Sequence, residues 1–150
     1  MNARGFTMAE IMVVLAIAGV LAVLVVPTLS SYARTVTLQA AARELATTIN
    51  LGRQVAISGN TTVCVEVSAP THIRLRTGGC GGAIWTGPGT DGAGAIKISG
   101  SSALRLSTTA NVVFTSLGAA SPAGTYTVTN PDTNGTRAVV VAATGRISVR

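Results

Sequence analysis

A chain of 150 residues with 47% hydrophobic residues is long enough for one packed domain and an additional segment. With one histidine, and two cysteines that lack CxxC spacing, the composition argues against a zinc site. The 11 lysines and arginines outnumber the 5 aspartates and glutamates, which gives a formal charge of +6. A basic surface attracts nucleic acid or anionic lipid, but without a dense basic run the charge also fits arginines that serve solubility alone.

The chain begins with a short polar leader that is followed by a long apolar run. Residues 1–5 carry one positive charge, and every residue from Ile11 to Val26 is apolar or glycine. As a helix, residues 6–26 would be about 31 Å long, close to the thickness of the bilayer hydrocarbon. The pattern predicts a membrane-spanning helix over 6–28, with Glu10 near one face of the bilayer.

Residues 29–59 are predicted to continue this helix beyond Pro27, where we expect a kink. Polar residues occupy one side of the segment, and Ser58-Gly59-Asn60 supplies a stop signal. The apolar residues recur at helical spacing, as Leu38, Ala42, Leu45, Ile49 and Ala56. The prediction is one helix of roughly 50 residues that is apolar all round in its first half and amphipathic in its second.

From residue 60 the pattern changes to the alternation that is typical of β-strands. Strands are expected over 61–68 and 71–77 with a turn at Ala69-Pro70, and a glycine-rich loop follows over 78–95. Tight turns are predicted at Asn134-Gly135 and Thr144-Gly145. The remaining strands are expected at 96–99, 103–107, 111–117, 125–129, 137–143 and 147–150. The fold class is therefore α+β, with the helix of 29–59 covering an antiparallel sheet domain over 60–150.

Catalytic motifs are missing from the sequence. It contains no nucleophile elbow, phosphate loop, dinucleotide fingerprint or zinc-protease motif. His72 falls on the expected solvent face of a strand, without an acidic residue at the same spacing. Residues 130–135 resemble the start of a calcium loop, but Val141 stands where the final glutamate belongs, so a plain hairpin turn is favoured. We expect neither an enzyme nor a cofactor.

The two cysteines have two possible states. If the domain is exported, Cys64 and Cys80 are expected to form a disulfide. Closing a loop of this length would stabilise the fold by roughly 3 kcal/mol. The alternative is two reduced, unpaired thiols.

Glu10 is an unexpected residue at the start of an apolar segment. If the chain is cut after Gly5, Phe6 acquires an N-terminal ammonium group, and Glu10 lies one helical turn further on. Between helices that pack side by side with an axial offset, Glu10 of one can pair with the Phe6 ammonium of the next. A mispaired register would leave a charge unpaired among apolar side chains, so one carboxylate can specify how subunits assemble.

These features together resemble the type IV prepilin signature. The signature comprises a short basic leader, the glycine-phenylalanine junction, a threonine, a glutamate, about twenty apolar residues and a proline. The resemblance implies cleavage after Gly5 by a prepilin peptidase, methylation of Phe6, and an assembly contact for Glu10. It also implies that the helix can loosen or bend at Gly19 and Pro27.

The rest of the chain resembles the minor pseudopilin called protein H of type II secretion and the FimT-type minor pilins. The resemblance rests on "INLGRQVAISGN", on the β-rich domain and on "ATGRISVR". It implies a structural subunit of a secretion pseudopilus or type IV pilus, whose partners are other pilin or pseudopilin subunits. The subunit would be a single-pass inner membrane protein with a periplasmic domain.

DNA is a further partner that the resemblance suggests. Some FimT-type pilins bind DNA for uptake through a Gly-Arg-x-Arg motif. This chain has Gly145-Arg146, but Ser148 stands where the second arginine would fall. Arg150 follows two residues later, on the same face if this segment is a strand.

An ordinary signal peptide is the alternative interpretation of the N-terminal segment. Arg4 would form its basic region and Ser31-Tyr32-Ala33 its cleavage site, releasing a soluble periplasmic binding domain. Against this, Glu10 interrupts the start of the apolar region, and the helical pattern continues through residue 33.

Overall fold

The computed structural model describes residues 7–98 and 103–150, apart from the side chains of 24–28 and 30, and within them the chain forms one helix and nine strands. The helix α1 (Met8–Ser58) is continuous through Gly19 and Pro27. At its end, Gly59 N donates to Val55 O at 2.9 Å and Asn60 has a positive φ of 45°. The prediction of one long helix with a stop at residues 58–60 is confirmed.

The chain divides into two compact units, residues 1–35 and 36–150. The second unit therefore contains the last part of α1 together with all the strands. Across the described parts of the chain, no helix combines the length and the apolar character that crossing a membrane requires. The expected span of 6–28 begins at Phe6, which lies outside the described residues, and the segment boundaries expected from the sequence remain predictions.

The strands of the second unit form two antiparallel sheets. Sheet A has the order β3-β2-β1-β6, with β4 also paired to β2, and sheet B has the order β5-β7-β8-β9. Sheet A consists of β1 (Val63–Ala69), β2 (His72–Thr77), β3 (Ala83–Ile84), β4 (Ala95–Lys97) and β6 (Val112–Phe114). Sheet B consists of β5 (Arg105–Thr108), β7 (Gly124–Asn130), β8 (Gly135–Val141) and β9 (Ile147–Val149).

The structure confirms the predicted α+β class and corrects several strand boundaries. The short strand β3 lies inside the glycine-rich loop, where no strand was predicted. The predicted strand 111–117 is wrong beyond Phe114, because Gly118 N donates to Thr115 O at 2.8 Å and closes a turn. Gly118 has a φ of +79°, a conformation that favours glycine over other residues.

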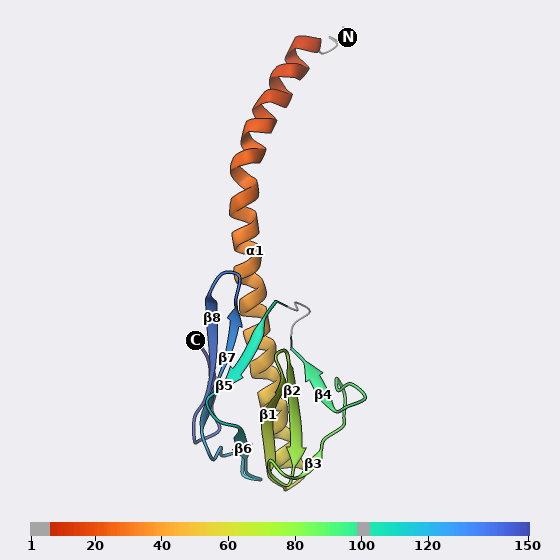
Figure 1. Ribbon diagram of the computed structural model, residues 1–150, viewed down its shortest axis with the longest axis vertical. Helices are drawn as coiled ribbons and strands as arrows, with labels where there is room; N and C mark the ends of the chain where they lie inside the picture. Colours follow the sequence, from red (N-terminus) through yellow and green to blue (C-terminus); the bar gives the residue numbers. More distant parts are fainter. Residues whose placement is uncertain (1–6, 99–102) are drawn as a thin grey trace, which may run out of the picture. The chain divides into compact units, whose positions relative to one another are not determined.

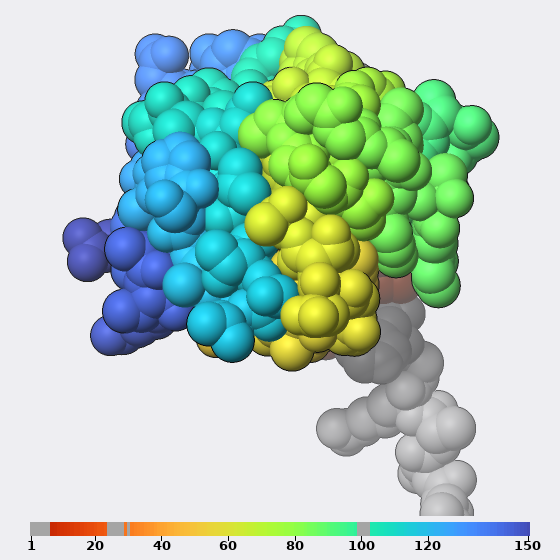
Figure 2. All heavy atoms as spheres, turned by 90° about the horizontal axis from the view of Figure 1, so that it is seen from below, coloured from red at the N-terminus to blue at the C-terminus, as the bar shows by residue number. Residues whose placement is uncertain are grey.

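The core lies between the amphipathic part of α1 and the inner faces of both sheets. Leu45 and Ile49 of the helix are fully buried against residues from the two sheets. In Figure 1, β7 and β8 lie on one side of this part of the helix and β2 to β4 on the other. Figure 2 shows the end of α1, in yellow, between the cyan residues around β6 and the green residues around β2 and β3. The amphipathic part of α1 thus packs against the inner faces of both sheets.

Two local predictions are also confirmed. Cys64 and Cys80 form a disulfide, with their Cα atoms 4.9 Å apart, and this bond ties β1 to the glycine-rich loop. The segment at 131–134 connects β7 to β8 as a hairpin, and Asn130 Oδ1 accepts a hydrogen bond from Asp132 N at 3.0 Å. The asparagine oxygen that resembled a calcium ligand is therefore engaged in the turn.

Candidate functional site

The first turn of α1 is closed by a reciprocal pair of side chains. Thr7 donates to Glu10 Oε2 through both its backbone N and its Oγ1, each at 2.9 Å. Glu10 N in turn donates to Thr7 Oγ1 at 3.3 Å. This is a capping box, which satisfies backbone donors that a helix start otherwise leaves without partners. This role of Glu10 was not predicted, although the spacing of a threonine and a glutamate three residues later is its sequence signal.

The first unit presents an apolar surface on all sides of its helix. All its described side chains from Thr7 to Val23 are exposed. Among the large apolar ones, the exposed fraction ranges from 51% for Ile11 to 79% for Met8. Apolar surface of this extent normally marks a site of contact with lipid or with another protein. Gly5 and Phe6, the predicted processing residues, lie outside the described part of the chain.

The arginines near the end of the sequence lie on one strand face, as predicted. In the pairing of β9 with β8, Val140 lies opposite Ser148, and Val139 and Val141 lie opposite Val149 and Ile147. Because side chains alternate along a strand, Arg146, Ser148 and Arg150 share the outer face, while Ile147 and Val149 face the core side. Arg146 and Arg150 are exposed.

The other arginines do not join this face. Arg74 and Arg76 lie on β2 in sheet A, where both approach Glu66 Oε1, at 3.6 and 3.0 Å. Arg137 pairs with the buried Val128 of β7, and paired residues point to the same face of a sheet. The Arg137 side chain therefore lies on the face of sheet B that Arg146 and Arg150 do not share. These arginines therefore do not gather on one surface, because they belong to different sheets and faces.

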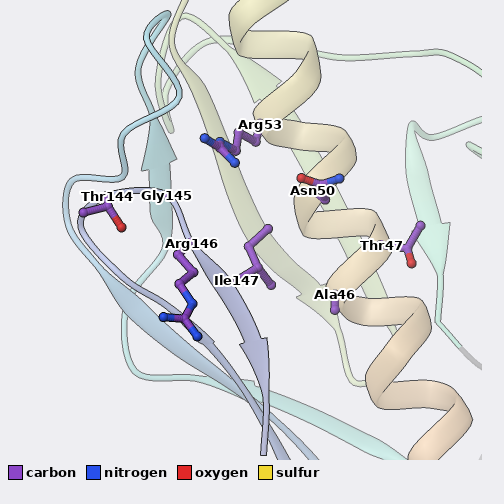
Figure 3. Close-up of a pocket in the computed structure, with 8 residues that line it drawn as sticks. All are labelled: Ala46, Thr47, Asn50, Arg53, Thr144, Gly145, Arg146 and Ile147. Atoms are coloured by element: carbon purple, nitrogen blue, oxygen red, sulfur yellow. The ribbon is translucent and has the colours of Figure 1, made fainter.

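A groove runs between α1 and the turn that leads into β9. Its volume is about 530 Å³. Figure 3 shows Ala46, Asn50 and Arg53 on the helix side and Ile147 on the strand side, facing the helix. The remaining lining residues are Thr47, Thr144, Gly145 and Arg146. The groove thus has a small apolar surface, one side-chain amide and the Arg53 side chain, and Arg146 lies at its margin with its side chain directed away from the helix (Figure 3).

Arg53 is bonded to the loop between β6 and β7, against which one wall of this groove packs. Its Nε donates to Gly118 O at 3.0 Å. A Cβ on Gly145 would lie 1.9 Å from the same carbonyl oxygen and 3.2 Å from Arg53 Nε. The β8–β9 turn therefore lies directly against the loop between β6 and β7, and only glycine fits at position 145. Arg53 was not predicted as a site residue, because in the sequence it is one polar residue on an ordinary amphipathic helix.

The fold and these sites define a class of protein. A long helix begins with an exposed apolar half, and its second half covers antiparallel sheets, which is the architecture of pilins. The profile of a prokaryotic N-terminal methylation motif matches residues 1–26. The profile described as type II transport protein GspH matches residues 41–145. The chain belongs to this GspH family of structural pilin or pseudopilin subunits, which assemble with other pilin subunits.

Solved structures of minor pilins and pseudopilins share the fold. The type IV minor pilin FimU of Pseudomonas aeruginosa is similar with a TM-score of 0.62 and 19% identity, over 79% of this chain and 92% of that one. The minor pseudopilin EpsH of the Vibrio cholerae type 2 secretion system is similar with a TM-score of 0.58 and 10% identity, over 76% and 96% of the two chains. No curated protein matches the sequence.

Proposed function

We propose that this chain is a minor pseudopilin that is anchored in the inner membrane, with residues 36–150 in the periplasm, and is built into a type II secretion pseudopilus. The observation that carries the proposal is the exposed apolar surface of the first unit. A surface that is apolar on every side needs lipid before assembly and the helices of other subunits afterwards. The family match over 41–145 favours the secretion pseudopilus over a type IV pilus.

Maturation follows from the methylation motif. A prepilin peptidase would cut between Gly5 and Phe6 and methylate the new amine of Phe6. The motif match over residues 1–26 supports this step. Intact-mass analysis of protein purified from its native membrane should find a chain that begins at a methylated Phe6. A chain beginning near Arg34 would instead support the signal-peptide interpretation.

Glu10 is the proposed assembly residue, through an ion pair with the Phe6 ammonium of a neighbouring subunit. Gly19 and Pro27 are proposed as positions where the helix can loosen as subunits pack. The carboxylate lies in the first turn of α1, next to the predicted new N-terminus. It is already bonded to Thr7, so the intersubunit pair would replace or share these bonds.

The assembly role is tested with two matched substitutions. Glu10→Gln removes the charge, whereas Thr7→Ala disrupts the capping box and keeps the charge. We expect Glu10→Gln to reduce the amount of the subunit in sheared filaments and Thr7→Ala to leave it near the wild-type level. Equal losses in both variants would mean that Glu10 only caps the helix, and wild-type levels of Glu10→Gln would contradict the assembly role.

The proposal as a whole is tested in a deletion strain that is scored for exoprotein secretion, pilus formation and DNA uptake. We expect secretion to fail and to be restored by the wild-type chain. A strain that still secretes but lacks pili would assign the subunit to a type IV pilus. Normal scores in all three assays would contradict the proposal.

DNA binding is the second candidate function, because Arg146, Ser148 and Arg150 share one exposed strand face. Along a strand, alternate residues are about 6.5–7 Å apart, which suits successive phosphates of a nucleic-acid backbone. Anisotropy titrations of duplex DNA at low and moderate salt test this function. Arg146→Gln with Arg150→Gln should weaken binding to all sequences and reduce its salt dependence. Binding that this double variant leaves unchanged would remove DNA from the role of β9.

A further inference from the structure

We propose that the groove between α1 and β9 binds an extended, acidic segment of a different subunit, which pairs with β9 as an additional strand. This inference rests on the proposed function, because it requires a neighbouring subunit in the same filament. The added strand would pair with the edge of β9 that does not face β8.

One edge of β9 pairs with no described strand. Among the described strands, β9 ends the order of sheet B and pairs only with β8. Arg150 exchanges two hydrogen bonds with Ala138, at 2.8 and 3.0 Å, and Arg146 O accepts one from Ala142 N at 2.9 Å. Because such bonds alternate along an antiparallel pair, the N–H and C=O groups of Ile147 and Val149 point away from β8. An edge of this kind is a template for a further strand.

The groove offers room and contacts beside that edge. Its volume of about 530 Å³ lies within the range of roughly 300–1,000 Å³ that is typical of binding clefts. Ile147 provides an apolar surface inside it, and Val149 of the same strand is 42% exposed. The side-chain amide of Asn50 lies on the helix side of the groove and makes no hydrogen bond to any described residue. Side chains on one face of an added strand would therefore meet apolar surface and an amide.

The charges around the groove select an acidic occupant. Arg53 and Arg146 line it, and a second cavity of about 280 Å³ beside it is lined by Arg146, Ser148 and Arg150. No acidic residue lines either cavity. Within the described residues, Arg146 and Arg150 have no ion-pair partner. Carboxylates on a neighbouring strand would form charge-assisted hydrogen bonds with these guanidinium groups.

A second copy of this chain does not fit that requirement. The chain has 5 acidic residues against 11 basic ones, so two copies repel each other. Glu66 is already paired with Arg74 and Arg76, and Asp91 Oδ1 accepts two backbone hydrogen bonds at 2.8 Å. The net repulsion between copies favours a different and more acidic subunit as the occupant.

The test measures amide hydrogen exchange by NMR on the full chain in detergent micelles. The probe is a synthetic peptide that alternates valine and glutamate, and its matched control alternates valine and lysine. We expect the acidic peptide to slow exchange at Ile147 and Val149 by at least about tenfold, because their outward N–H groups become hydrogen-bonded. Ser148, which already faces β8, should change little, and the lysine peptide should protect neither position.

Substitutions separate strand pairing from charge attraction. Val149→Pro removes one outward N–H and leaves the bonds to β8 in place, whereas Val149→Ala keeps that N–H. We expect only the proline variant to abolish binding. Arg146→Gln should raise the Kd of the acidic peptide by about tenfold. Arg105→Gln, on β5 at the opposite edge of sheet B, should leave the Kd unchanged.

A further probe covers the case in which Val149→Pro disturbs β9. The acidic peptide is methylated on alternate backbone nitrogens, so it keeps its charge and cannot donate to the strand. We expect this peptide to give no protection. Protection by the methylated or the lysine peptide, or no protection by the acidic one, would overturn the proposal. If the deletion strain still fails to secrete in that case, the chain remains a filament subunit that docks through another surface.

Discussion

The hydroxyl of Tyr126 donates a hydrogen bond of 2.7 Å to the carbonyl oxygen of Val65. The same hydroxyl accepts a hydrogen bond from Val112 N at 3.1 Å. Tyr126 lies on β7 in sheet B, whereas Val65 and Val112 lie on β1 and β6 in sheet A. One fully buried side chain therefore joins the two sheets across the core.

Tyr126→Phe should lower the free energy of unfolding by about 1–3 kcal/mol, because a buried carbonyl and a buried N–H lose their partner. Denaturant titrations of the full chain in detergent measure this change. Tyr32→Phe is the matched control, since Tyr32 is 66% exposed in the first unit and should shift stability by less than about 0.5 kcal/mol. Equal effects of the two substitutions would show that the bridge between the sheets contributes nothing.

Alkaline pH should destabilise the fold through the same side chain. Burial raises the pKa of Tyr126 to about 12, whereas an unfolded tyrosine titrates near 10. Below about pH 10 both states keep the proton, and between about 10 and 12 only the folded state keeps it. Stability should therefore fall with rising pH in that window, by up to about 1.4 kcal/mol per unit. Unfolding measured across this range should show a steeper fall in the wild type than in Tyr126→Phe, and parallel curves would contradict the assignment.

Gly145→Ala should destabilise the second unit by at least about 2 kcal/mol, because its φ of +80° disfavours other residues and its Cβ would lie 1.9 Å from Gly118 O. Gly92→Ala is the control, since a Cβ there meets nothing within 4 Å. Thermal unfolding of both variants checks the difference. A Gly145→Ala variant as stable as the wild type would mean that the turn can move away from Gly118 without cost.

Loss of the disulfide should cost about 3 kcal/mol, because Cys64 and Cys80 close a loop of 16 residues in the unfolded chain. The double variant Cys64→Ser with Cys80→Ser and the reduced wild type should lose similar amounts in denaturant titrations. Thiol labelling of denatured, unreduced protein should find no free cysteine. Labelling at both positions would show that the bridge does not form in the cell.

Much of the fold could be predicted from local patterns. The long helix was predictable because its apolar spacing persists from Leu38 to Ala56 and ends at a Ser-Gly-Asn stop signal. The first hairpin was predictable because valines recur at every second position before Ala69-Pro70 and Ile73 and Leu75 do so after it. The register shift between Val67 and Ala69 was not predictable in this way. The shared outer face of Arg146, Ser148 and Arg150 followed from strand alternation alone.

The division into two sheets and the groove beside β9 were not predictable in the same way. Alternation shows that a segment is a strand but does not show which strand it pairs with. The bridge from Tyr126 to Val65 joins residues 61 positions apart, and the contact of Arg53 with Gly118 spans 65. Such contacts depend on the tertiary arrangement, so a single sequence without that arrangement does not indicate them.

The capping box of Thr7 and Glu10 has a consequence for how readily a filament can turn over. A subunit that waits in the membrane already has its carboxylate hydrogen-bonded within its own helix. Joining a filament of the proposed kind would exchange these hydrogen bonds for an ion pair with a neighbour, so the gain at this position is the difference between the two and not the full strength of the ion pair. Addition and removal of a subunit would then differ less in free energy at this position than the ion pair alone suggests. Growth and shortening of the filament could respond to the supply of subunits instead of requiring a strong bond to be broken each time.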